Sequence, residues 1–182
     1  MGRFIITPIE SNHFQFVDPD IVKTALDLPT IDSPLVPPAS ITNYRVGETC
    51  VLHVEHPQGS FVIVGSAGYI EGGLQGFKAD VLFLGVGSLG EQSVEHRQKY
   101  WEETVGRLQP STVIPIHYYS LLGEPRGPVR GHSALYGVMS GADNLNVLPF
   151  LDENLSRSAS VAYIASMPRF IEVKVIPAMK TR

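Results

Sequence analysis

Val81-Leu82-Phe83-Leu84 and Val113-Ile114-Pro115-Ile116, separated by a helical stretch over residues 93–108, decide the fold of this chain. Both short runs are continuously apolar, which is typical of strands covered on both faces in a parallel sheet. Between them, apolar residues recur at helical spacing: Val94, Trp101, Val105 and Leu108. Ser93 precedes this stripe as the expected N-cap. The order strand, helix, strand predicts a βαβ unit with a parallel strand pair.

Further elements are predicted on both sides of this unit. Phe4–Ile9 is a strand-like segment, and Cys50–Glu55 and Ser60–Val64 form a predicted hairpin with Gly59 at positive φ. A short helix is expected over residues 18–28, after Asp18-Pro19. Towards the end of the chain, residues 145–155 are expected to be partly helical and residues 169–176 to form a terminal strand. The chain is therefore predicted to be one α/β domain over 1–182, with a core over 1–120 and a C-terminal extension over 121–182.

The composition limits the kinds of partner and compartment. Hydrophobic residues make up 43% of the 182 residues and charged residues 18%, which favours a packed core over disorder. A net charge of -4 without a basic run argues against nucleic acid as a partner. The single cysteine, Cys50, excludes an intrachain disulfide and is predicted to be a buried, inert thiol. No membrane-spanning run or signal peptide is expected, so the predicted location is cytoplasmic.

Three loops are candidates for a functional site, because ligands bind outside the carboxyl ends of strands in open parallel sheets. The first is the turn Gly65-Ser66-Ala67-Gly68, and the second is Gly85-Val86-Gly87-Ser88-Leu89-Gly90. The third is His117-Tyr118-Tyr119, directly after the last predicted strand. We expect these three loops to converge at one edge of the sheet.

Two of these loops allow alternative interpretations. Gly85–Gly90 matches G-x-G-x-x-G, the fingerprint of dinucleotide-binding domains. The next strand, however, ends in His117-Tyr118 where the fingerprint expects an acidic residue, so a scaffold role is preferred. Ser66 is a candidate nucleophile, but Val64 stands where a nucleophile elbow requires glycine.

Histidines supply the strongest candidates for chemistry. His117 follows a buried Ile-Pro-Ile approach, which suits a ligand or an acid–base group. His13 lies in the polar turn after the first strand. Four others are expected to be solvated or structural residues of a hairpin, a helix and a loop: His53, His56, His96 and His132.

Taken in order, four segments resemble the metallo-β-lactamase-fold metal-dependent hydrolases: Phe4–His13, Phe61–Gly68, Ala79–Leu84 and Val113–His117. They are similar to the strands and turns that carry two of that family's histidines and its Gly-Asp-Thr-Gly turn. The run Pro34–Pro38 and the pair Leu89-Gly90 resemble a branch with Gly-Ser-Ala-Gly in the turn. The resemblance implies the C-terminal half of an αββα fold, a mixed β-sheet covered by helices on one face.

The resemblance also implies an incomplete metal site. The family's H-x-H-x-D-H signature is absent, and Ser66 stands at the position of its metal-bridging aspartate. His13 and His117 are the implied ligands of a divalent metal (Zn, Fe or Mn), bound weakly or not at all by one chain. The residues expected to line this site are Gly65, Ser66, Ala67, Gly87 and Tyr118.

Half of a two-sheet sandwich leaves one apolar sheet face without a partner, and soluble monomers rarely expose such a face. We therefore expect a homodimer formed through that face. Two functions stay open at this point: a hydrolase-like protein with an incomplete metal site, and a non-catalytic assembly or binding module on a degenerate hydrolase fold. A nucleotide-binding domain is the third and least favoured alternative.

Overall fold

The computed structural model describes residues 3–14, 31–40, 43–45, 47–117 and 144–157. The predicted helix over 18–28, the predicted strand over 169–176, His132 and Tyr118 lie outside the described residues. The statements below concern only the part of the chain that the structure describes.

A single mixed sheet forms the centre of the fold. Its strands are β1 (Ile5–Ser11), β2 (Thr49–His56), β3 (Gly59–Val64), β4 (Val81–Gly85) and β5 (Thr112–Ile116). They lie side by side in sequence order, with β1, β2 and β3 antiparallel and β3, β4 and β5 parallel. The predicted hairpin and the parallel β4–β5 pair are confirmed, and Gly59 has the expected positive φ of 154°.

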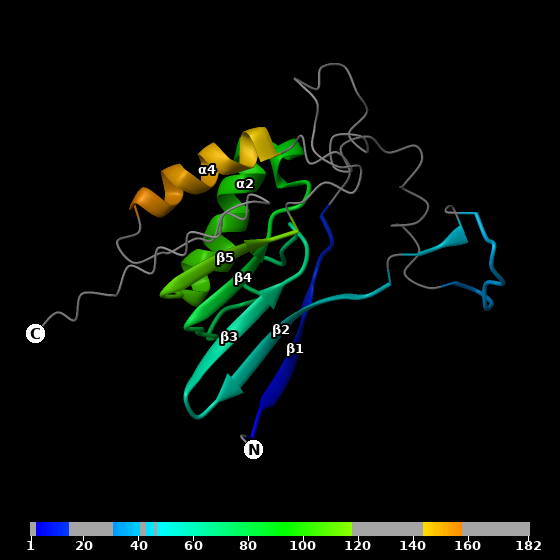
Figure 1. The fold of residues 1–182 in the computed structure, drawn as a ribbon, viewed down its shortest axis with the longest axis horizontal. Coiled ribbons are helices and arrows are strands. Elements are labelled where there is room, and N and C mark those ends of the chain that lie inside the picture. Colours follow the sequence, from blue (N-terminus) through cyan, green and yellow to red (C-terminus); the bar gives the residue numbers. More distant parts are fainter. Residues whose placement is uncertain (1–2, 15–30, 41–42, 46, 118–143, 158–182) are drawn as a thin grey trace, which may run out of the picture.

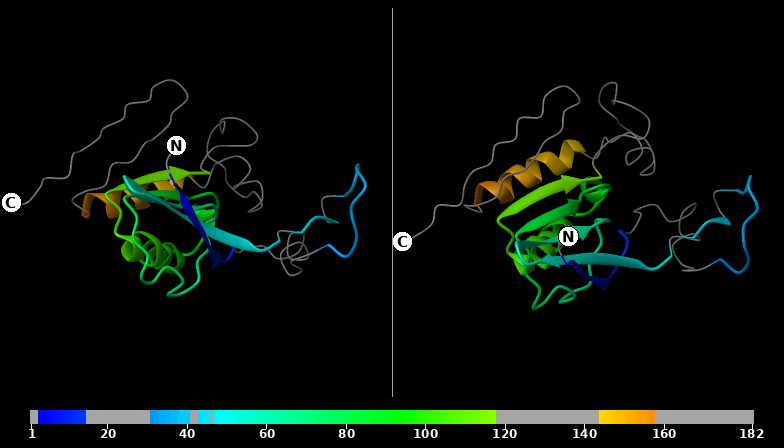
Figure 2. Two further views of the ribbon diagram at one scale, coloured as in Figure 1. Left: turned by 90° about the horizontal axis from the view of Figure 1, so that it is seen from below. Right: turned by 60° about the horizontal axis from the view of Figure 1, so that its bottom comes forward.

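The helical segments cover one face of this sheet (Figures 1 and 2). They are the short 3₁₀ turn η2 (Leu89–Glu91), α2 (Val94–Trp101), the π-helical turn η3 (Glu102–Gly106) and α4 (Asn144–Arg157). Ser93 is the N-cap of α2, and its side chain accepts a hydrogen bond from the amide of His96 at 3.1 Å. None of the described helices is long and apolar enough to cross a bilayer.

The core lies between the sheet and these helices. Alternate residues of β3, β4 and β5 point into it and are almost fully buried: Val62, Val64, Leu82, Leu84 and Val113. Tyr100 and Leu108 cover them from the helical layer, with Val147 and Leu151 of α4 in the same cluster. Burying an aliphatic side chain of this size contributes roughly 1.5–3 kcal/mol, so this layer is the main source of stability.

The helix after β4 departs from the predicted stripe in two places. Trp101, Val105 and Leu108 are buried as predicted, but Val94 is 70% exposed and Glu103, expected on the polar side, is 4% exposed. The π-helical turn η3 changes the phase of its own residues and accounts for the burial of Glu103. Val94 precedes that turn and is exposed because it is the first residue of α2, at the end of the helix.

The other face of the sheet carries no described helix, and we call it the open face. It consists of the alternate strand residues that point away from the core: Ile6, Pro8 and Glu10 of β1, Cys50, Leu52, Val54 and His56 of β2, Gly59, Phe61 and Ile63 of β3, Val81, Phe83 and Gly85 of β4, and Thr112, Ile114 and Ile116 of β5. Within the described part of a single chain, β4 is covered on one face only, because Val81 and Phe83 keep partial exposure. Cys50 is also exposed rather than buried, since it belongs to this face.

The two edge strands each contain a proline. Pro8 lies in β1 opposite Leu52, and Pro115 lies in β5 opposite Leu84. Proline has no amide hydrogen for a strand ladder, and edge strands are where sheets tolerate it. The three inner strands contain no proline.

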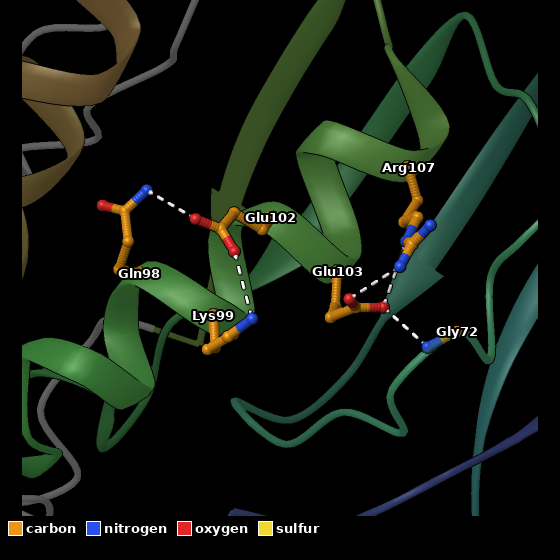
Figure 3. A network of polar contacts seen from close by, with 6 residues as sticks. All are labelled: Gly72, Gln98, Lys99, Glu102, Glu103 and Arg107. Atoms are coloured by element: carbon orange, nitrogen blue, oxygen red, sulfur yellow. Dashed lines mark hydrogen bonds and ion pairs between the residues drawn. The ribbon is translucent and has the colours of Figure 1, made fainter.

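A buried carboxylate ties the loop before β4 to η3 (Figure 3). Glu103 accepts a hydrogen bond from the amide of Gly72 at 2.7 Å and pairs with the guanidinium of Arg107 at 3.0 Å. The hydrogen bond from Arg107 is the main reason that the pKa of Glu103 lies below its usual value; the Gly72 amide adds to the effect, and desolvation opposes it. Glu102, its neighbour, forms an exposed ion pair with Lys99 at 3.6 Å.

Replacing this carboxylate tests its contribution. Glu103→Gln should lower the free energy of unfolding near neutral pH by about 1–3 kcal/mol, because it removes charge-assisted hydrogen bonds from a buried site. Since folding lowers the pKa of Glu103, this stabilisation is present above the unfolded pKa of about 4.3 and is lost as pH falls through the folded pKa. Urea denaturation across that range measures both effects.

Glu102→Gln is the matched control, because exposed ion pairs contribute about 0–1 kcal/mol. Equal destabilisation by the two variants, or a Glu103→Gln effect that is the same in acid and at neutral pH, would contradict this account.

Candidate functional site

The strand directions bring four chain segments to one edge of the sheet. Because β2 is antiparallel to both β1 and β3, and β4 and β5 are parallel to β3, four strands end at this edge. The segments that follow β1, β3, β4 and β5 are residues 12–14, 65–68, 86–90 and residue 117. We call this region the carboxyl edge.

His117 is held against the loop after β4. The amide of Val86 donates to the carbonyl of Ile116 at 2.9 Å, which joins the two strand ends. A Cβ atom on Gly87 would lie 2.6 Å from the carbonyl oxygen of His117 and 2.9 Å from its Nδ1. The loop therefore requires glycine here. His117 itself is exposed and has a φ of 61°, a left-handed conformation that non-glycine residues adopt rarely and often at functional sites.

His13 is held against the turn after β3. A Cβ atom on Gly68 would overlap the carbonyl oxygen of Asn12 and lie 2.6 Å from the carbonyl carbon of His13. The amide of Phe14 donates to the hydroxyl of Ser66 at 3.0 Å. Ser66 is 7% exposed, so this bond satisfies a buried amide and fixes the His13 segment on the turn. The hydroxyl of Ser66, at the position where the resemblance implies a carboxylate, therefore stabilises the local structure.

The two histidines are close enough to affect one another. Burial lowers the pKa of His13 below its usual value, and the hydrogen bond between its Nδ1 and the carbonyl of Phe14, at 2.9 Å, opposes this change. The charge of His117 lowers the pKa of His13 further, so the two imidazoles lie within the range of a mutual electrostatic effect. His13 is consequently neutral at physiological pH, the form in which histidine binds metals.

The chemistry of these groups fits part of a metal site. When Nδ1 of His13 donates to the Phe14 carbonyl, the basic nitrogen is Nε2, the usual arrangement for a metal-binding imidazole. Two imidazoles suit Zn, Fe or Mn, but a stable zinc site needs at least three good protein ligands. In the described residues, no group of three or more His, Cys, Asp or Glu side chains is arranged to hold a metal ion.

Two residues of α2 shape this edge and were not predicted to do so. The hydroxyl of Tyr100 donates to the carbonyl of Gly85 at 2.7 Å and lies 3.3 Å from that of Ser66. His96, one helical turn earlier, lies with Nε2 at 3.0 Å from the carbonyl of Ala67. The spacing of four between two polar aromatic residues was a usable signal, because such residues share a helix face.

The remaining predicted lining residues differ in accessibility. Gly65 is exposed, whereas Ala67 is fully buried beneath the turn. In the Gly85–Gly90 loop, a Cβ atom on Gly85 would lie 2.6 Å from the carbonyl of Val64. This glycine is therefore required by the approach of neighbouring strands, which accounts for it without a cofactor.

Comparisons with known proteins identify no relative of this chain. No family model, no curated protein and no solved structure matches the chain. The interpretation of the carboxyl edge therefore rests on the geometry of His13, His117 and Ser66 and on the sequence itself.

Removing the Tyr100 hydroxyl tests how the two glycine loops are joined. Tyr100→Phe leaves the buried carbonyl of Gly85 without this donor, so the free energy of unfolding should fall by about 1–3 kcal/mol. Hydrogen exchange should also increase at the amides of residues 65–68 and 86–90. Tyr44→Phe, at a tyrosine that is 48% exposed, is the control and should change neither quantity. Unchanged exchange in Tyr100→Phe would contradict a bridging role.

Proposed function

We propose that this chain is a metallo-β-lactamase-fold hydrolase-like protein in which His13 and His117 are two ligands of an incomplete divalent-metal site. The observation that carries the proposal is that both histidines lie at the carboxyl edge, beside Gly68 and Gly87, near enough for the charge of His117 to lower the pKa of His13. They are 104 positions apart in the sequence (117 minus 13), so only the fold brings them together.

The architecture supports the same proposal. A mixed sheet with helices on one face and apolar residues on the other is the layer arrangement expected of half an αββα sandwich. His13 lies two residues after the end of β1 and His117 directly follows β5, in the order that the sequence resemblance implies. Ser66 lies in the turn after β3, between these strands in the sheet order.

The residues of this chain would prepare the site in three ways. Phe14 orients the imidazole of His13 through its carbonyl, and burial keeps that imidazole neutral. Gly87 allows His117 to lie close over the loop after β4. A bound divalent metal would supply the activated water that attacks an ester, amide or phosphodiester. With two imidazoles alone, however, we expect weak metal binding and no hydrolysis by a single chain.

Zinc titration of the full chain tests the ligand assignment. We expect weak binding in isothermal titration calorimetry, with a Kd that rises by about tenfold or more in His13→Ala and in His117→Ala. Because the pKa of His13 is lowered, its imidazole stays neutral below the usual histidine pKa of about 6.5, so binding should persist into mildly acidic buffer.

His56→Ala is the matched control, because His56 lies on the β2–β3 hairpin at the far end of these strands. Zinc binding that is unaffected by both His13→Ala and His117→Ala, or that falls equally in His56→Ala, would overturn the assignment.

A gain-of-binding variant gives a separate test. Ser66→Asp supplies a carboxylate at the turn between the two histidine-bearing segments, and its oxygen can still accept the amide hydrogen of Phe14. A third good ligand should tighten zinc binding by about tenfold or more, since three ligands are the usual minimum. Gly65→Asp, on an exposed neighbour, is the control. Equal affinities of Ser66→Asp and the wild type would show that Ser66 does not face the metal.

A non-catalytic assembly or binding module is the second candidate. The observation that favours it is the open face, which is apolar and has no described cover. In this case the chain retains the fold while the carboxyl edge has lost its chemistry. The absence of zinc binding together with stable self-association would favour this candidate over the first.

A further inference from the structure

The open face is continuous and nearly free of charge. Its residues form rows across neighbouring strands, of which the first contains Ile6, Val54, Phe61, Val81 and Thr112 and the second Pro8, Leu52, Ile63, Phe83 and Ile114. Among the described strand residues on this face, the ionisable groups are Glu10, at a corner of the sheet, Cys50, and His56, beside the β2–β3 turn. Two such faces can meet without bringing a charge into the centre of the contact.

The open face is not flat, which affects how a second protein surface can pack on it. At the β1 edge, Phe4 and Ile6 are each 61% exposed. Over β3 and β4 lies an open groove of about 600 Å³, lined by apolar side chains that include Phe61, Val81 and Phe83 and, at its end beside the β2–β3 turn, by the polar residues Gln58, Ser60 and Asp80. The face therefore carries exposed apolar side chains at its β1 edge and has a groove over β3 and β4 that apolar side chains of a partner can enter.

We propose that the open face binds a second copy of this chain, related by a two-fold axis that runs parallel to the strands. Such an axis through β3 places β1 of each copy over the β4–β5 side of the other, because the strand order is β1 to β5 without interruption. This rotation also places β2 of each copy over β4 of the other, so that Leu52 and Val54 lie over the groove of the partner and Ile6 lies beside it, over β5. An axis across the strands would instead place β1 over β1 and leave both grooves unfilled.

The size of the face suits this contact. Five strands spaced about 4.8 Å apart, each at least five residues long at about 3.3 Å per residue, cover roughly 24 by 16 Å. This is at least the width of the sheets of three or four strands that bury one another in immunoglobulin-type sandwiches. Two copies would enclose a second core about 10 Å thick between their sheets.

The direction of the axis has a consequence for the carboxyl edge. Rotation about an axis parallel to the strands keeps strand direction, so both carboxyl edges lie at the same end of the dimer. The His13 and His117 pairs of both copies then lie at that same end. This consequence rests on the proposed metal function, whereas the dimer itself rests on the open face alone.

Two lysine substitutions at neighbouring positions test the interface. Size-exclusion chromatography with light scattering should give a dimer mass for the full chain at micromolar concentration. Ile6→Lys should give a monomer, because it places a charge in the contact. Ile5→Lys is the matched control: Ile5 is 62% exposed on the same strand but points to the opposite face, so the dimer should persist. Circular dichroism establishes that both variants are folded.

Cys50 provides an independent measurement, because it is the single cysteine and belongs to the open face. Its reaction with a thiol reagent should be slow in the wild type and in Ile5→Lys, and at least tenfold faster in Ile6→Lys. A wild-type monomer with a protected thiol would indicate that another segment of the chain covers the face. A wild-type monomer with a reactive thiol would indicate an open face that does not self-associate, and either result overturns the proposal.

Equal masses for Ile6→Lys and Ile5→Lys would also overturn the proposed dimer interface. The outcome is separable from that of the zinc titration. If the chain is a dimer that does not bind zinc, the proposed interface stands and the proposed metal site is wrong. If it is a monomer that binds zinc, the metal site stands and the interface is wrong.

Discussion

The carboxyl edge depends on one hydroxyl group that joins two loops from within the core. Tyr100 is fully buried, and burial raises the pKa of its hydroxyl well above the usual value, so the group remains a donor at any physiological pH. Its short bond to the carbonyl of Gly85, and its approach to that of Ser66, fix the strand ends of β3 and β4 relative to α2. The segments bearing His13 and His117 are attached to these loops, so their separation follows from the same contact.

The covered and open faces of the sheet contribute differently to the stability of a single chain. The covered face contains the aliphatic residues that stabilise a single chain, and it anchors the helices that hold the carboxyl edge. The open face contributes less to a single chain, because Ile6, Phe83 and their neighbours keep part of their surface in water. A β-sheet layer of this kind gains further stability when an apolar layer covers it.

The sequence predicted most of the sheet and helices, and its errors have identifiable physical causes. Continuous apolar runs located β4 and β5, but such runs are the same whether the second face is covered by the chain or exposed, which is why Phe83 was expected to be covered. The constant helical period misplaced Glu103, because no local signal announced the π-helical turn, and it misplaced Val94, because it takes no account of where the helix begins. Of the candidate site, the convergence of the loops followed from parallel strand topology. The contacts of Tyr100 and His96 could not be predicted in this way, since they depend on how α2 packs against the loops.

The prolines of the outer strands bear on how this protein avoids aggregation. An exposed strand edge is a template for adding further strands, which leads to open-ended fibrils. Pro8 and Pro115 each remove an amide hydrogen from the strands that form the two borders of the sheet. Growth by edge-to-edge ladders is thereby discouraged at both ends, while an apolar face of fixed width still allows a closed pair. The prolines thus disfavour strand addition at these two borders without obstructing the face through which we propose that two copies bind.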